Sequence, residues 1–125
     1  MRAGRDAQRL GRFWESYAAE FLTRQDFRII AQGYRCRLGE LDIIGSDGPG
    51  LVIVEVRARK NSNKGSAVET IGNLKRRRIV NATRHFLMHN PSWSSRPIRF
   101  DVIAVDGIET SKPRIRWVQN AFDGT

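Results

Sequence analysis

The feature that most constrains the fold is a turn sequence between two β-prone runs. Asp47-Gly48-Pro49-Gly50 separates the apolar run 41–44 from the apolar run 51–56. Gly and Pro between two such runs predict a β-hairpin. A symmetric four-residue loop would bring Asp42 opposite Glu55 on one face of the sheet. The full set of expected pairs is 46 with 51, 44 with 53, 42 with 55 and 40 with 57.

Two acidic side chains at opposite positions in a sheet need an explanation. Their Cβ atoms would lie about 5 Å apart, where like charges destabilise a strand pair. A metal cation held between Asp42 and Glu55 would explain why the chain keeps them. The alternatives are that the pair is exposed to solvent, or that it is neutralised by Arg59 and by Arg57, which alternation along the strand places on the same face as Glu55.

The basic residues are concentrated next to this acidic pair. Lys and Arg total 22 against 13 Asp and Glu, which gives a net charge of +9. Residues 57–84 hold nine basic residues and one acid, Glu69, a local balance of +8. Such a zone suits a phosphodiester substrate, because cations hold the backbone and carboxylates hold a metal. A solvated basic surface is the alternative, and an acidic-lipid patch is the weaker one because no amphipathic anchor is present.

The length of 125 residues predicts one domain over residues 1–125. No apolar run approaches the ~20 residues of a membrane span. The N-terminus does not lead into the apolar stretch of a signal peptide. Cys36 is the single cysteine, so an internal disulfide is excluded and the cytoplasm is the expected compartment.

Helical spacing of apolar residues predicts an amphipathic helix over residues 4–24. Glu15 lies at the edge of its apolar stripe and Glu20 on the opposite side, so Glu15 is better placed to face a site. An ordinary acid on the helix surface is the alternative for Glu15. The stripe consists of Leu10, Phe13, Trp14, Tyr17, Ala18, Phe21 and Leu22.

A second helix is predicted from Ser66 to about Met88. Ser66 and Glu69 have the spacing of a capping box at its start. Lys75 falls within the inward apolar stripe, whereas residues 76–78 point to other sides. An ammonium among apolar side chains is expected to reach a carboxylate or a bound phosphate, with extension to solvent as the alternative. Strands are expected over residues 27–37, 98–105 and 114–118, the last at an edge of the sheet.

Several of these segments, in this order, resemble the PD-(D/E)xK nuclease superfamily, which includes restriction endonucleases and Holliday-junction resolvases. The resemblance is strongest to the bacterial YraN-like family and covers most of the chain. The segments that carry it are Gly11-x3-Glu15-x2-Ala18, Gly39-Glu40-Leu41-Asp42-Ile43-Ile44, Val54-Glu55-Val56-Arg57-Ala58-Arg59, Lys75-Arg76-Arg77-Arg78 and Arg99-Phe100-Asp101-Val102.

The resemblance implies an α/β fold with a restriction-endonuclease-like αβββαβ core, in which helices flank a mixed central sheet. It implies a Mg²⁺ or Mn²⁺ site made by Asp42 and Glu55, with Glu15 as a further acid. Arg57 and Lys75 would join the two ligands as catalytic residues. The residues expected to hold flanking phosphates are Arg59, Lys60, Lys64, Arg76, Arg77 and Arg78.

The chain departs from the superfamily at one catalytic position, where Arg57 stands in place of the usual Lys. A lysine can orient or help deprotonate the attacking water, whereas Arg stays charged and is no base. Arg57 could instead stabilise charge on the phosphate, or be neutralised by Glu40. In either case Lys75 is the candidate for the missing ammonium.

Two functions of different classes follow from these observations. The first is a metal-dependent endonuclease that binds nucleic acid, DNA rather than RNA, and cuts a branched or single-stranded substrate. The second is a non-catalytic nucleic-acid-binding module that retains the fold, and Arg57 is the residue that favours it. A basic scaffold for a protein partner is the third reading. The resemblance and the need to cut two strands favour a homodimer.

Overall fold

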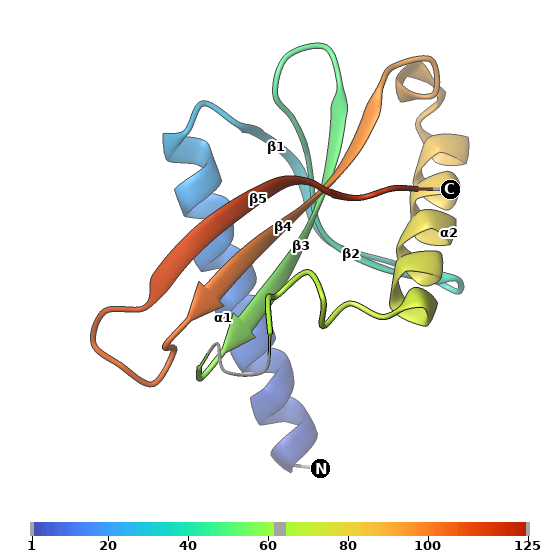
Figure 1. The fold of residues 1–125 in the computed structure, drawn as a ribbon. Helices are drawn as coiled ribbons and strands as arrows, with labels where there is room; N and C mark the ends of the chain where they lie inside the picture. The colour runs from blue at the N-terminus through green and yellow to red at the C-terminus, as the bar shows by residue number, and fades with distance from the viewer. Residues whose placement is uncertain (1, 62–64, 125) are drawn as a thin grey trace.

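The computed structural model describes residues 2–61 and 65–124, with the side chains of the first helix described from residue 7 onward. Neither helix in these ranges has the length and apolarity needed to cross a membrane. The described residues form two α-helices, one 3-10 helix and five strands (Figure 1). In chain order they are α1 (Arg2–Arg24), β1 (Arg28–Cys36), β2 (Gly39–Ser46), β3 (Leu51–Arg59), α2 (Asn73–His89), η1 (Pro91–Trp93), β4 (Ile98–Asp106) and β5 (Arg114–Phe122).

The strands form one sheet in the order β1-β2-β3-β4-β5. The pair β3–β4 is parallel and the other pairs are antiparallel. The parallel pair requires a crossover, and α2 supplies it. The expected α/β class and mixed sheet are therefore confirmed, and β5 is longer than the predicted edge strand 114–118.

The two helices cover opposite faces of the sheet (Figure 1). On β3, Leu51 and Ile53 pack in the core under α2, whereas Val52 and Val54 pack in the core under α1. Burial on both faces explains why β3 reads as a continuous apolar run without alternation. These central strands carry the acidic pair, Asp42 on β2 and Glu55 on β3.

The first half of α1 differs from the predicted stripe. Trp14, Ala18 and Leu22 are buried as expected, but Leu10 is 52% exposed and Phe13 is 57% exposed. Figure 1 shows the reason, because the N-terminal half of α1 runs past the ends of β3 and β4, where no strand lies beneath it. This overhang leaves apolar side chains beside the end of the sheet.

The predicted start of the second helix is wrong. The Ser66 hydroxyl does accept a hydrogen bond from the Glu69 N–H at 3.2 Å, but the bond closes an isolated turn, and α2 begins at Asn73. Gly72 is extended at this point, with ψ of 170°. Arg76 ties this turn to the first turn of α2, since its guanidinium donates to the carbonyl oxygens of Val68 and Ile71.

A candidate metal centre and nucleic-acid interface

The hairpin register is confirmed near the turn and changes at the acidic pair. Ser46 pairs with Leu51 and Ile44 with Ile53, as predicted, and the ladder ends at Ile43 and Val54. Beyond that point the Asp42 Oδ2 accepts the N–H of Val56 at 2.9 Å. The expected backbone pairs 42–55 and 40–57 are therefore replaced by a side-chain contact, which opens the sheet where the carboxylates lie.

Asp42 and Glu55 come together at this opening, and both are buried, with 8% and 3% of their surface exposed. The Lys75 Nζ lies 3.1 Å from the Glu55 Oε1, which confirms that this lysine points inward to a carboxylate. α2 can approach β2 closely because position 39 is Gly. A Cβ there would lie 2.8 Å from the carbonyl oxygen of Arg78.

Burial dominates the ionisation of this pair. Desolvation, followed by the Asp42 charge, raises the pKa of Glu55 to about 8, although Lys75 opposes the rise. Desolvation also raises the pKa of Asp42, against the Val56 N–H and Lys75. For Lys75, burial lowers the pKa, but the carboxylates of Glu55, Asp42 and Glu40 together more than offset it, so its pKa is raised. The ammonium is therefore charged at neutral pH.

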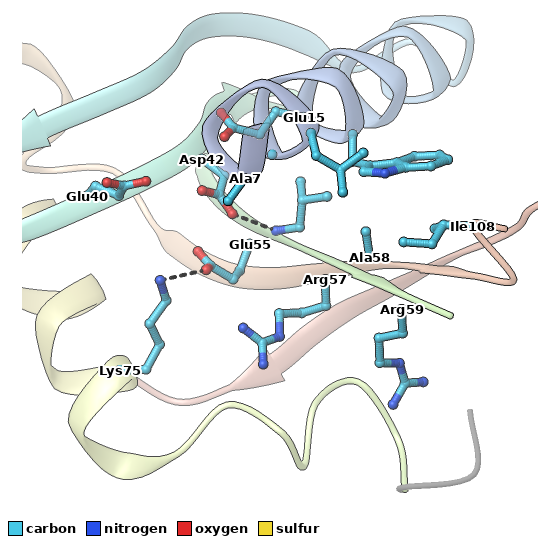
Figure 2. Close-up of a pocket in the computed structure, with 14 residues that line it drawn as sticks. Ala7, Glu15, Glu40, Asp42, Glu55, Arg57, Ala58, Arg59, Lys75 and Ile108 are labelled. Atoms are coloured by element: carbon cyan, nitrogen blue, oxygen red, sulfur yellow. Dashed lines mark hydrogen bonds and ion pairs between the residues drawn. The ribbon is translucent and has the colours of Figure 1, made fainter. Parts of the chain in front are cut away.

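Glu15 faces the same site from α1, as predicted. Desolvation raises its pKa to about 7, and the charges of Asp42 and Glu40 add to the effect. Glu20, in contrast, lies on the exposed side and pairs with Arg24 at 3.7 Å. Figure 2 shows the carboxylates of Glu15, Asp42 and Glu55 gathered at one end of the cavity.

Arg57 does not neutralise the pair. Its Nε donates to the Thr70 Oγ1 at 3.2 Å and its Nη2 to the Thr70 carbonyl oxygen at 3.4 Å. In Figure 2 its guanidinium points away from Asp42, toward the segment before α2. Nor does Glu40 neutralise Arg57, because Glu40 pairs with Arg35 at 3.6 Å. Arg57 therefore anchors the turn before α2, and Lys75 is the ammonium beside the carboxylates.

Three of the six predicted phosphate-binding cations have protein partners instead. Arg59 pairs with Asp106 at 2.9 Å and donates to the Gly65 carbonyl oxygen. Lys60 pairs with Glu109 at 3.1 Å. Arg76 holds carbonyl oxygens and lies over the Phe122 ring at 5.2 Å. Lys64 lies outside the described residues.

The remaining cations lie in two separate hollows. Arg77 borders a hollow with Arg84 that shares no lining residue with the carboxylate site. Arg78 borders a hollow with Arg35 and Arg37, which adjoins the site through Glu40 and Lys75. The sequence analysis missed Arg35 and Arg37 because the hairpin β1–β2, and no basic run, brings them there.

The carboxylates line a cavity of about 470 Å³, which we call the carboxylate cavity. Among the described residues, two buried side-chain polar atoms lack a hydrogen-bond partner, the Glu55 Oε2 and the Trp14 Nε1. Both residues line this cavity. Unsatisfied buried groups are rare in native proteins and commonly mark an ion, a water or a functional role.

The donor set fits a hard cation that keeps much of its hydration. Within residues 2–61 and 65–124, no group of three or more His, Cys, Asp or Glu side chains is placed to hold a metal. Mg²⁺ commonly binds through one or two carboxylates and retains several waters. Asp42 and Glu55, with the unpaired Oε2, meet that requirement, and Glu15 lines the same cavity.

Comparison with known proteins places the chain in a family. Residues 14–105 match the profile described as "Uncharacterised protein family UPF0102". A UPF0102 protein of Pseudomonas syringae pv. syringae (strain B728a) is 41% identical over 116 residues, 93% of this chain and 94% of that protein. A UPF0102 protein of Ectopseudomonas mendocina (strain ymp) is 43% identical over 114 residues, 91% and 94% of the two chains. The chain therefore belongs to the family UPF0102, as its resemblance to the YraN-like family led us to expect.

Proposed function

We propose that this protein is a Mg²⁺- or Mn²⁺-dependent endonuclease that hydrolyses phosphodiester bonds in DNA. The observation that carries the proposal is the pair Asp42 and Glu55. These two buried carboxylates face an opening in the sheet, with one oxygen unpaired and a lysine alongside. Buried acids of this kind, with raised pKa values in a cavity, are typical of functional sites.

Asp42 and Glu55 would hold the ion, and Glu15 its waters. When bound, such an ion lowers the pKa of water and stabilises charge on the leaving oxygen. Hydrolysis joins a water oxygen to phosphorus and breaks one P–O ester bond. The task left to the chain is to hold the phosphate and to balance its negative charge.

Lys75 would hold the phosphate and balance its charge. Its charged ammonium lies at the mouth of the pair, 39% exposed and therefore able to meet a phosphate oxygen. Arg57 acts indirectly, because its hydrogen bonds to Thr70 hold the turn that precedes α2. The element order α1-β1-β2-β3-α2-β4 supports a restriction-endonuclease-like core in which the catalytic lysine comes from α2.

Titration calorimetry with Mn²⁺ and a nuclease assay test the acidic pair. Asp42→Asn should abolish detectable Mn²⁺ binding and lower the cleavage rate by at least about 1,000-fold, because one of two protein ligands is lost. Glu20→Gln is the matched control, since it removes an exposed acid of α1, and it should behave as the wild type. Full cleavage by Asp42→Asn would refute the proposal.

Exchange of the two basic candidates tests the role of Lys75. Lys75→Gln should lower the cleavage rate by about 100-fold, the usual effect of removing one electrostatic donor. Arg57→Gln should change the cleavage rate by less than about tenfold and lower the melting temperature, because it frees Thr70. A large loss of cleavage in Arg57→Gln and a small one in Lys75→Gln would assign the catalytic role to Arg57.

A non-catalytic nucleic-acid-binding module is the second candidate. The observation in its favour is that Lys75 already partners Glu55, so the pair is partly neutralised by the protein itself. This candidate predicts salt-sensitive DNA binding, no Mn²⁺ binding by the wild type and no cleavage. The same calorimetric titration therefore separates the two functions.

A further inference from the structure

Two recesses of opposite chemistry lie on either side of the carboxylates. One is the apolar end of the carboxylate cavity, which we call the α1 crevice, lined by Ala7, Leu10, Trp14, Ala58 and Ile108. The other is a hollow of about 400 Å³ that we call the hairpin hollow, bordered by Arg35, Arg37, Glu40, Lys75 and Arg78. Because Glu40 and Lys75 border both cavities, a single elongated ligand can occupy both recesses.

The hairpin hollow offers cations that the protein leaves available. Arg37 and Arg78 are exposed, and neither has an ion pair among the residues that the structure describes. Arg59, Lys60 and Arg76, by contrast, are committed to protein partners. Backbone phosphates next to the site would therefore find their counter-charges at the β1–β2 turn and α2.

The α1 crevice offers an apolar wall. It exists because α1 overhangs the end of β3, so that Leu10 faces the cavity and remains 52% exposed. The buried Trp14 N–H, which lacks a partner, belongs to the same wall. The carboxylate cavity as a whole has about 470 Å³, within the range of about 300–1,000 Å³ found for small-ligand sites.

A nucleic-acid strand carries both of the required chemistries. Its phosphates are anionic and its bases have apolar faces. In a continuous duplex those faces are stacked against neighbouring bases, and extruding one costs a few kcal/mol, least where the base is already unpaired. Only a strand with an unpaired nucleotide presents a phosphate to one recess and a base face to the other.

We propose that the substrate is a nucleic-acid strand with an unpaired nucleotide beside the scissile phosphate. The base of that nucleotide lies in the α1 crevice, and the phosphates on the other side lie over Arg37 and Arg78 in the hairpin hollow. This assignment rests on the proposed function for the position of the scissile phosphate. It makes single strands, flaps and unpaired junctions substrates, and continuous duplex a poor one.

Binding without added divalent metal tests the assignment independently of cleavage. Fluorescence anisotropy would compare a labelled single strand with a duplex of equal length. The wild type should bind the single strand more tightly. Leu10→Ser should weaken single-strand binding about fivefold to tenfold through the lost base contact and leave duplex binding unchanged. Met88→Ser, which alters an exposed apolar residue near the far end of α2, is the control and should have no effect.

The salt dependence of the same binding tests the hairpin hollow. Replacing Arg37 and Arg78 together by Gln should reduce the slope of log K against log salt by about 1.4, the value for two phosphate contacts on a single strand. Replacing Arg77 and Arg84 by Gln removes the same charge from the other side of α2 and should leave the slope unchanged. Equal slopes for the two double variants would overturn the assignment of Arg37 and Arg78.

Two outcomes separate this inference from the proposed function. Cleavage of continuous duplex at least as fast as single strands, with no effect of Leu10→Ser, would overturn the inference and leave a metal-dependent nuclease. The other outcome is a preference for single strands, with the predicted variant effects, and no metal-dependent cleavage. That outcome would support the inference and show that the protein binds nucleic acid without cutting it. Circular dichroism of each variant confirms that it is folded.

Discussion

At the scale of single residues, Glu55 is a buried carboxyl whose ionisation opposes the stability of the fold. Its carboxyl is 3% exposed, and the Asp42 carboxyl lies beside it. Desolvation and that neighbouring charge both favour the protonated form of Glu55. The protein therefore bears an ionisation cost at neutral pH, which Lys75 reduces and which a bound cation would reduce further.

The resulting pH dependence of stability has a definite sign. The pKa of Glu55 is about 8 in the folded protein against an ordinary value of 4.5. The contribution of Glu55 to the free energy of unfolding is therefore fully present below about pH 4.5 and is lost as pH rises through 8. The free energy of unfolding should therefore decline over this range, by a few kcal/mol in order of magnitude. Glu55→Gln should flatten the decline in urea titrations. A slope unchanged in this variant would contradict the buried, protonated state of Glu55.

At the scale of elements, Asp101 joins β4 to β5. Its side chain is fully buried and accepts hydrogen bonds from the Arg99 guanidinium, the Trp117 Nε1 and the Asn120 N–H. The sequence analysis located this residue within a strand but assigned it no role in the site. The structure agrees with that separation, since Asp101 does not line the carboxylate cavity.

Removal of this carboxylate should be costly for the strand pair. Asp101→Ala removes the buried acceptor of the Trp117 Nε1 and of the Asn120 N–H and takes a carboxylate from Arg99, so a loss of about 3–5 kcal/mol is expected. Chemical denaturation measures it, and Asp47→Ala is the control, because it also removes a carboxylate from Arg99 but at an exposed turn. Equal losses for the two variants would show that burial of Asp101 does not matter.

At the scale of the whole molecule, local signals in the sequence predicted the sheet and the acidic pair. The turn at 47–50 predicted the register as far as Ile43 and Val54, next to the acidic pair, and helical spacing placed Glu15 and Lys75 on inward faces. Longer-range geometry was not predictable. The overhang of α1 depends on where β3 ends, and the partners of Arg57 and Arg59 come from a turn and a strand that no local pattern relates to them.

The two helices and five strands should also unfold together. Both helices pack on the same sheet, so calorimetry should show one transition with equal calorimetric and van't Hoff enthalpies, about 90 kcal/mol near 60 °C for a chain of 125 residues. Two resolved transitions would show that one helical layer is a separate cooperative unit.

The parallel pairing of β3 with β4 also determines the order in which the site is assembled. Leu51 pairs with Ile98, so this contact joins distant parts of the chain and forms late, because long loops close slowly. The hairpin β2–β3 can form earlier, nucleated at its apolar turn end. The other end of this hairpin carries Asp42 and Glu55, and it gains its counter-charge only when α2 packs and places Lys75 beside Glu55. A chain still emerging from the ribosome would therefore carry the two carboxylates before their counter-charge, and the proposed metal site would be among the last features to form as the chain folds.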